Sequence, residues 1–359
     1  MNTHIVWLFI SISCINVFFI VQQGLSAAAI DDPTEETTST EMTSTTSETD
    51  IVEQELFLGN FTGSCCLKRD PLEAGAQPPF ESDEQDYPGL ESKMNPRPDF
   101  GYKSYHGSDK LKGKVAIITG GDSGIGRAVA LAYAREGASV VISYLNETED
   151  AEEIQTILQG EGHECLLIPG DITDEAHCKK IIDQTIEKFE RIDILVNNAA
   201  YQGKELENSI EDMSHDRVLY TFQTNIISMF DLTRYAIPHM SRGSSIINVA
   251  SIQAYSPSAG ILDYATTKAA IVAFTKGLAE KMLEKGIRVN CVAPGPVWTP
   301  LIVTSYSKEK SSQFGANSPM KRPAQPRELA PAFVFLANGK ESTYITGEIL
   351  SVTGGRITA

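Results

Sequence analysis

From Lys112 onward, short apolar runs alternate with longer amphipathic stretches, and this alternation restricts the fold more than any other feature. The runs are rich in Val, Ile and Leu. The stretches between them show helical spacing, as at Ile271, Phe274 and Leu278. Near-continuous apolar strands separated by helices indicate a parallel sheet that is covered on both faces. We therefore predict an α/β fold with a doubly wound parallel sheet, in one domain spanning residues 113–359. The predicted strands are 115–119, 139–143, 165–168, 192–196, 245–250, 287–292 and 348–352.

The N-terminal segment resembles an export signal. Residues 5–21 are apolar and uncharged, and small residues at Ala27–Ala29 suit a cleavage site. We predict that residues 1–29 are a secretory signal peptide, which places the protein in the secretory pathway or outside the cell. A retained anchor is the alternative, because no Lys or Arg precedes the run and its length is close to that of a bilayer span. The protein would then be membrane-tethered and lumenal, held through residues 5–21.

Two segments of different composition separate this run from the predicted domain. Residues 30–77 include a long stretch of Thr, Ser and acidic residues that cannot bury enough apolar surface to fold, so we predict a disordered linker. A glycosylation sequon lies within it at Asn60. Residues 78–112 are rich in Pro, Gly and charged residues, and they predict an extended arm that lies on the folded body.

The overall charge and the cysteines exclude some classes of function. The net charge of −17 argues against nucleic acids and anionic membranes as partners, because both are polyanions. The six cysteines form no CxxC pair and show no metal-like spacing with the six histidines, so no metal site is predicted.

The first predicted strand leads into the glycine-rich stretch TGGDSGIGRAVA, residues 119–130. Gly120, Gly124 and Gly126 fall between this strand and a predicted helix. Glycines at such a turn let the backbone approach a pyrophosphate, whose charge faces the N-terminus of the helix. Strand, turn and helix together predict a dinucleotide-binding turn of a Rossmann fold.

Several motifs resemble those of the short-chain dehydrogenase/reductase family, over residues 113–355. Thr119–Gly126 resembles the TGxxxGxG turn of that family. VNNAA, residues 196–200, resembles its NNAG motif with alanine in place of the glycine. Asp171 resembles the aspartate that contacts adenine in the family. Residues 293–299 resemble the loop that holds the nicotinamide carboxamide, and residues 344–355 resemble the C-terminal strand of the family.

The arm resembles one branch of that family. Residues 86–114 are similar to an N-terminal extension found in NADP-dependent aldehyde reductases, which are often described as glucose/ribitol-dehydrogenase-like. The stretches SIQAYSPS and QFGANSPMKRPAQPRELAP resemble the same branch. This resemblance implies an NADP(H)-preferring oxidoreductase that acts on CH–OH groups, with aldehyde reduction as the expected reaction. Family members are commonly tetramers, so the resemblance also implies a homotetramer.

Ser251, Tyr264 and Lys268 form the expected catalytic set. Tyr264 and Lys268 are four residues apart and share one face of a predicted helix. A nearby ammonium stabilises a phenolate and lowers the pKa of tyrosine, which suits Tyr264 to general acid/base catalysis. The resemblance implies that Ser251 hydrogen-bonds the substrate oxygen and that Lys268 also holds the ribose hydroxyls. It further implies that Asn225 positions a water in a proton relay.

The choice between NAD and NADP depends on the end of the second predicted strand. NAD enzymes favour an acidic residue there, which binds the ribose 2′-hydroxyl. This chain has Tyr144 at that position, and neither of the positions where NADP enzymes favour a basic residue, Leu145 and Ser123, carries one. The absence of an acid removes repulsion against a 2′-phosphate, so NADP is predicted, with NAD as the alternative. The expected cofactor-binding residues are Gly120, Ser123, Gly124, Ile125, Gly126, Tyr144, Asp171, Asn198, Tyr264, Lys268, Pro294, Gly295, Val297 and Thr299.

A second sequon, at Asn146, lies beside this expected adenosine pocket. A glycan there would crowd the ribose of the cofactor, so we predict that Asn146 stays unmodified.

The substrate is expected to be a small carbonyl compound or alcohol. Residues 297–325 predict a long irregular lid, in which Trp298 and Phe314 either line an apolar pocket or pack the lid down. The alternative function is a catalytically silent exported module that binds nucleotide or acts as a scaffold. The intact Ser251, Tyr264 and Lys268 set argues against that alternative.

Overall fold

The computed structural model describes residues 70–206, 210–356 and 358. The predicted signal peptide or anchor, residues 30–69 of the linker and the Asn60 sequon lie outside the described residues. Within the described part of the chain, no helix is long and apolar enough to cross a membrane. Export and glycosylation stay predictions.

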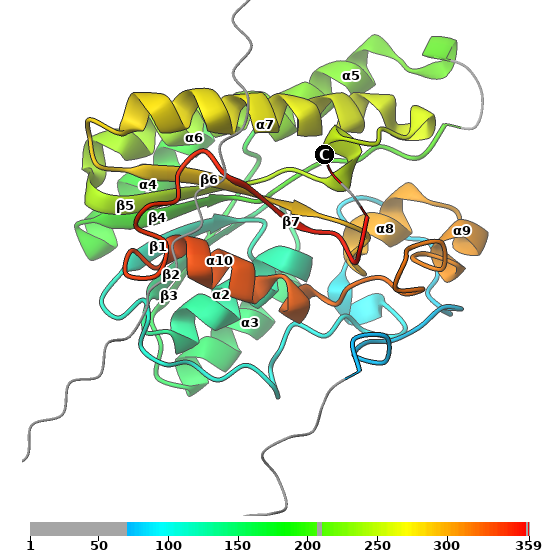
Figure 1. The fold of residues 1–359 in the computed structure, drawn as a ribbon, viewed down its shortest axis with the longest axis horizontal. Coiled ribbons are helices and arrows are strands. Elements are labelled where there is room, and N and C mark those ends of the chain that lie inside the picture. The colour runs from blue at the N-terminus through cyan, green and yellow to red at the C-terminus, as the bar shows by residue number, and fades with distance from the viewer. Residues whose placement is uncertain (1–69, 207–209, 357, 359) are drawn as a thin grey trace, which may run out of the picture. The chain divides into compact units, whose positions relative to one another are not determined.

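The described residues form one sheet of seven parallel strands in the order β3-β2-β1-β4-β5-β6-β7 (Figure 1). This order confirms the doubly wound sheet, since the strands extend from β1 in both directions. All seven predicted strands are present. The largest difference is at the start of β5. This strand begins at Met240, five residues earlier than predicted, because Met240 pairs with Ile192 of β4 ahead of the polar stretch 241–244. The strands are β1 Val115–Thr119, β2 Ser139–Tyr144, β3 Cys165–Pro169, β4 Ile192–Asn197, β5 Met240–Val249, β6 Arg288–Pro294 and β7 Ile349–Val352.

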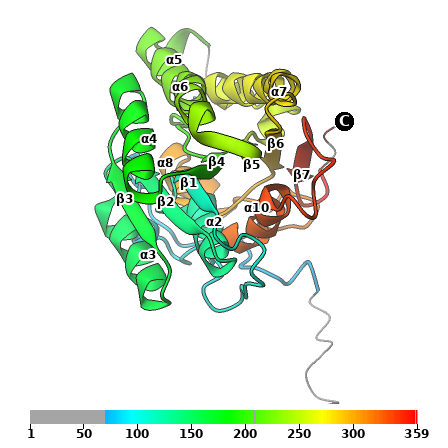
Figure 2. The same ribbon diagram turned by 90° about the vertical axis from the view of Figure 1, so that its left-hand side faces the viewer.

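Helices cover both faces of this sheet. Figure 2 shows α4, α6 and α7 on one side, and α2 and α10 on the other. The main helices are α2 Gly124–Arg135, α3 Thr148–Gly160, α4 Glu175–Phe189, α5 His215–Phe222, α6 Ser228–Ala236, α7 Leu262–Met282 and α10 Ala330–Ala337. Shorter elements are α8 Pro300–Ser305, α9 Lys308–Ser312, a π-helical turn at Gln223–Ile227, and 3-10 turns at Glu91–Lys93, Ile210–Asp212, Ile237–His239, Ile252–Ala254, Ala259–Ile261 and Pro326–Glu328.

The core consists of two apolar layers, one on each face of the sheet. Successive side chains of a strand point to opposite faces, so Ile118 belongs to the layer under α2 and α10, whereas Ile117 belongs to the layer under α4 and α6. All five residues of β1 are buried. Because both faces of these strands are buried, the strands appear in the sequence as unbroken apolar runs.

The arm lies on the domain and is held by side chains from distant parts of the sequence. Its Phe80 ring packs against Trp298 with 4.2 Å between ring centroids, and Trp298 Nε1 donates a 2.7 Å hydrogen bond to the Pro96 carbonyl. Contacts also occur N-terminal to residue 78. Arg322 Nη2 donates to the Pro71 carbonyl at 2.7 Å, and Arg327 donates to the Ala74 carbonyl.

Trp298 therefore packs the segment down, whereas Phe314 lines the cavity described below. The segment 297–325 is less irregular than expected from its sequence, because α8 and α9 form within it. Each of these helices has no more than six residues, so they give little periodic signal.

Candidate active site

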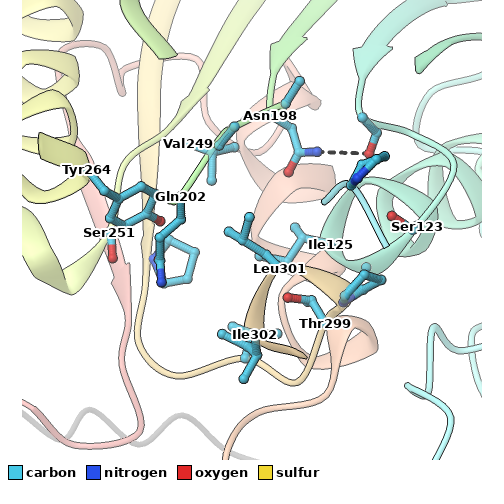
Figure 3. Close-up of a pocket in the computed structure, with 18 of the residues that line it drawn as sticks. Ser123, Ile125, Asn198, Gln202, Val249, Ser251, Tyr264, Thr299, Leu301 and Ile302 are labelled. Carbon is cyan, nitrogen blue, oxygen red and sulfur yellow. Dashed lines mark hydrogen bonds between the residues drawn. The ribbon is translucent and has the colours of Figure 1, made fainter. Parts of the chain in front are cut away.

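The turn between β1 and α2 has the tight backbone that its glycines predict. A Cβ at Gly126 would lie 1.8 Å from the Gly120 carbonyl oxygen, and Gly124 has a φ of +52°. Asn198, at the end of β4, donates from Nδ2 to the carbonyls of Thr119 and Gly120 at 2.9 and 3.0 Å. Figure 3 shows such a contact between Asn198 and the turn. Asn198 thus fixes the turn against the neighbouring strand.

A cavity of about 640 Å³ opens at the carboxyl ends of the strands, where the strand order reverses between β1 and β4. Ligands of doubly wound sheets bind at this switch point. The predicted residues that line the cavity are Gly120, Ser123, Gly124, Ile125, Tyr144, Asp171, Asn198, Ser251, Tyr264, Lys268, Pro294, Gly295, Val297 and Thr299. The turn, the volume and this lining fit a nicotinamide dinucleotide.

Two predicted residues do not line the cavity. Gly126 lies behind it, where it allows the close approach of α2 to Gly120. Asn225 is buried in the π-helical turn, and its side chain holds the backbone of Tyr201, accepting from the amide at 2.7 Å and donating to the carbonyl at 2.9 Å. Asn225 Nδ2 also donates to Thr267 Oγ1 at 3.0 Å. A water relay at this turn stays a prediction.

Ser251, Tyr264 and Lys268 meet on one wall of the cavity. Ser251 follows β5, and the other two lie one turn apart on α7 (Figure 3 labels Ser251 and Tyr264). Lys268 Nζ lies 5.2 Å from the centroid of the Tyr264 ring and donates a 2.8 Å hydrogen bond to the Val249 carbonyl. The ammonium is therefore fixed beside the phenol by the end of β5.

Burial changes the pKa of both groups. It raises the pKa of the Tyr264 phenol, and a hydrogen bond from Ser251, not the Lys268 ammonium, opposes that rise. The expectation of a lowered tyrosine pKa beside Lys268 is therefore wrong, because burial dominates. It lowers the pKa of the Lys268 ammonium to about 8. Tyr264 is therefore protonated at neutral pH, as a proton donor must be, while Lys268 still carries most of its charge.

The low pKa of Lys268 has a consequence for stability. The unfolded chain holds this proton more tightly, with the ordinary lysine pKa of 10.5, so burying the charge destabilises the fold below pH 8, and the penalty shrinks as pH rises toward 10.5. We expect Lys268→Met to raise the free energy of unfolding at pH 7 by on the order of 3 kcal/mol, since one pKa unit corresponds to about 1.4 kcal/mol. Urea unfolding at pH 7 and pH 10 measures this. An unchanged or lower midpoint at pH 7 would contradict it.

The cavity also contains acidic residues that the sequence analysis did not assign. Asp122, from the glycine turn, and Glu147, just after β2, line the end near Tyr144. Asp122 Oδ2 is buried without a hydrogen-bond partner. Burial raises the pKa of the Asp122 carboxyl to about 8, and the charge of Glu147 adds to the rise. This chain has no acid at Tyr144, but Asp122 and Glu147 line the same cavity. A prediction that considers only the residue at the end of β2 cannot detect them.

The arm contributes to the cavity as well. Tyr87 lines it, and the Tyr87 ring contacts the ring of Tyr201 edge-on at 4.9 Å between centroids. Among the described residues, no group of three or more His, Cys, Asp or Glu side chains could hold a metal ion.

The family model described as enoyl-(acyl carrier protein) reductase matches residues 120–356. A solved short-chain dehydrogenase from Burkholderia cenocepacia, in complex with NADP, is 29% identical and superposes with a TM-score of 0.63, over 68% of this chain and 98% of that one. The chain belongs to the short-chain dehydrogenase/reductase family. The resemblance drawn from the motifs is thereby confirmed.

Two curated relatives from Arabidopsis thaliana belong to the expected branch. The chloroplastic NADPH-dependent aldehyde reductase 1 is 49% identical over 276 residues, covering 75% of this chain and 95% of the relative. The glucose and ribitol dehydrogenase homolog 2 is 49% identical over 290 residues, covering 79% of this chain and 99% of the relative. These proteins confirm the branch that the arm indicated.

Proposed function

We propose that this short-chain dehydrogenase/reductase transfers hydride between a nicotinamide cofactor and a carbonyl or alcohol group, and that it reduces small aldehydes with Tyr264 as the general acid. The observation that carries this proposal is the single wall formed by Ser251, Tyr264 and the fixed Lys268. A non-enzymatic scaffold would have no use for a buried ammonium whose burial destabilises the fold. The name of the aldehyde reductase relative supports the same reaction.

Ser251, Tyr264 and Lys268 have different roles in the proposed reduction. A reduced nicotinamide bound in the cavity would supply the hydride for the new C–H bond. The Ser251 hydroxyl binds the carbonyl oxygen, and Tyr264 gives its phenolic proton to that oxygen as the C=O double bond becomes a C–O single bond. The Lys268 ammonium stabilises the phenolate that remains. A proton from solvent then restores Tyr264.

The direct test mixes the full chain with NADPH or NADH and one member of a panel of small aldehydes, ketones and sugars, and measures the rate at which the cofactor is oxidised. Turnover in wild type that is absent in Tyr264→Phe supports the proposal. Nucleotide binding without turnover of any carbonyl compound would instead favour the binding module.

NADP(H) is our proposed preferred cofactor. Support comes from the NADPH-dependent relative and from the raised pKa of Asp122. A carboxyl with a pKa of about 8 is largely neutral at pH 7, so it can donate a hydrogen bond to a 2′-phosphate instead of repelling it. The protonated Asp122 carboxyl, and not the absence of an acid at Tyr144, is the basis of the proposed preference.

The cofactor preference is expected to change with pH. Asp122 loses its proton as pH rises through about 8, and the new charge repels a 2′-phosphate but not a 2′-hydroxyl. Glu147 and Asp150 add negative charge nearby, and Ser123 donates a hydrogen bond to the carboxylate. We expect the ratio of KM for NADPH to KM for NADH to rise about tenfold between pH 7 and pH 9.

Steady-state kinetics at both pH values measures this ratio. Asp122→Asn should make the ratio independent of pH. Glu152→Gln, which removes an exposed acid from α3, is the matched control and should keep the wild-type response. A pH-independent ratio in wild type would contradict the role of Asp122.

A further inference from the structure

The amide of Gln202 is a buried donor without a partner. Gln202 is 5% exposed, lines the cavity, and its Nε2 makes no hydrogen bond of normal geometry. A buried donor that is left unpaired costs free energy, and native proteins rarely leave one without a reason. In Figure 3, the Gln202 side chain reaches toward Ser251 and Tyr264.

The backbone around Gln202 is held at several points. Asn225 fixes the preceding residue, Tyr201, through its amide and its carbonyl. Ser305 Oγ donates to the Gln202 carbonyl at 3.0 Å, and the Glu205 amide donates to the Ser305 carbonyl at 2.8 Å. The segment is therefore clamped between the π-helical turn and the end of α8. The amide keeps its place in the cavity because the chain around it is fixed, even though the amide itself is unpaired.

The neighbours of the amide place it at the substrate end of the cavity. The Tyr306 hydroxyl is within reach of the amide, since the Gln202 side chain acts on it as a donor and opposes the rise that burial causes in the pKa of Tyr306. This contact lacks the geometry of a full hydrogen bond. Tyr306 in turn adds to the burial-driven rise in the pKa of Tyr264. Leu301 and Ile302 supply apolar surface on the same lining, and they offer no side-chain acceptor to Nε2. The amide is therefore only weakly engaged within the chain, and it can donate to an acceptor on a ligand that enters the cavity.

We propose that Gln202 determines substrate specificity by donating from Nε2 to an oxygen on the carbon next to the reacting carbonyl. This inference rests on the proposed function, because Tyr264 and Ser251 define where the reacting carbonyl lies. The substrate class is then aldehydes with an oxygen on the adjacent carbon, of which α-hydroxyaldehydes are the simplest. A site with a donor for that oxygen disfavours the analogue that lacks it, since the analogue leaves the buried amide unpaired.

The test compares two aldehydes that differ by one hydroxyl, lactaldehyde and propanal. Wild type should reduce lactaldehyde with the higher kcat/KM. Gln202→Met keeps an unbranched side chain of similar size but removes the donor. It should lower kcat/KM for lactaldehyde by about 10- to 100-fold and leave propanal nearly unchanged. Gln313→Met is the matched control, because Gln313 lines the same cavity but is exposed, and it should preserve the preference.

A purely structural role for Gln202 predicts a different pattern. If the amide serves only to hold Tyr306, then Gln202→Met and Tyr306→Phe should lower the reduction of both aldehydes by the same factor, and that result would overturn the proposal. Equal reduction of both aldehydes by wild type would overturn it as well.

The proposal is testable even if neither aldehyde is turned over. Saturation-transfer NMR then compares 1,2-propanediol with 1-propanol on the protein with oxidised cofactor. Preferential binding of the diol that Gln202→Met removes supports the inference, and equal binding of the two alcohols overturns it. The failure of the specificity proposal is thus separate from the failure of the proposed reaction.

Discussion

Replacing Tyr264 with phenylalanine is expected to lower kcat for aldehyde reduction by about 10²- to 10⁴-fold, the usual contribution of a positioned general acid. The substitution removes one oxygen from a buried ring on α7 and leaves the carbon skeleton in place. Affinity for NADPH should change little, because residues of the glycine turn and of the end of β2 line the part of the cavity away from Tyr264 and would hold the other half of the cofactor. The loss should therefore appear in kcat, with the dissociation constant of NADPH close to that of wild type.

The pH profile of wild type tests the same arrangement. Lys268 loses its proton as pH rises through about 8, while the raised pKa of Tyr264 keeps the phenol protonated. We therefore expect kcat for reduction to fall above pH 8, because the ammonium that stabilises the phenolate disappears. Tyr255→Phe is a suitable control for Tyr264→Phe, since Tyr255 is exposed and lies in the loop between β5 and α7, outside the helix that carries Tyr264. If Tyr264→Phe retains more than about a tenth of the activity, Tyr264 is not the general acid.

The strands and the proximity of Tyr264 to Lys268 could be predicted from sequence because each has a local signal, whereas Ser251 was placed beside them only by the family resemblance. A strand buried on both faces reads as an apolar run, and a helix places Tyr264 and Lys268 together at a spacing of four. The composition of residues 78–112 likewise predicted an arm that lies on the domain. What it contacts was not predictable, since the Pro96 carbonyl meets Trp298 about two hundred residues away in the sequence.

Asp122 and Gln202 escaped the sequence analysis for a related reason. Asp122 falls within the glycine turn, where an acid reads as an ordinary turn residue. Gln202 follows the NNAA motif with no pattern of its own. Both are notable only because a buried polar atom lacks a partner, and burial depends on how the whole chain folds around the cavity. In our proposals the choices of cofactor and substrate depend on these two residues, so the sequence motifs indicate the reaction better than they indicate the ligands.

Glu91 is expected to be the strongest single contribution of the arm to stability. Its carboxylate lies at the N-terminus of α2, where Oε2 accepts a 2.7 Å hydrogen bond from the Gly124 amide and Oε1 pairs with Arg127 Nη1 at 2.8 Å. The side chains of both Glu91 and Arg127 are 0% exposed. The Glu91 amide also donates to Asp150 Oδ2 at 2.6 Å. One residue of the arm thus connects the first turns of α2 and α3, beside the phosphate-binding turn.

Glu91→Ala should lower the free energy of unfolding by about 3–5 kcal/mol, because it leaves the buried Arg127 with a reduced set of partners and the Gly124 amide without an acceptor. Lys93→Ala, an exposed position in the same 3-10 turn, should change it by less than about 0.5 kcal/mol. The double variant Glu91→Leu with Arg127→Met should recover much of the loss, since a buried ion pair can often be replaced by apolar side chains at little cost. Urea unfolding followed by circular dichroism measures all three variants. A Glu91→Ala midpoint equal to that of Lys93→Ala would mean that the arm rests on the domain without stabilising it.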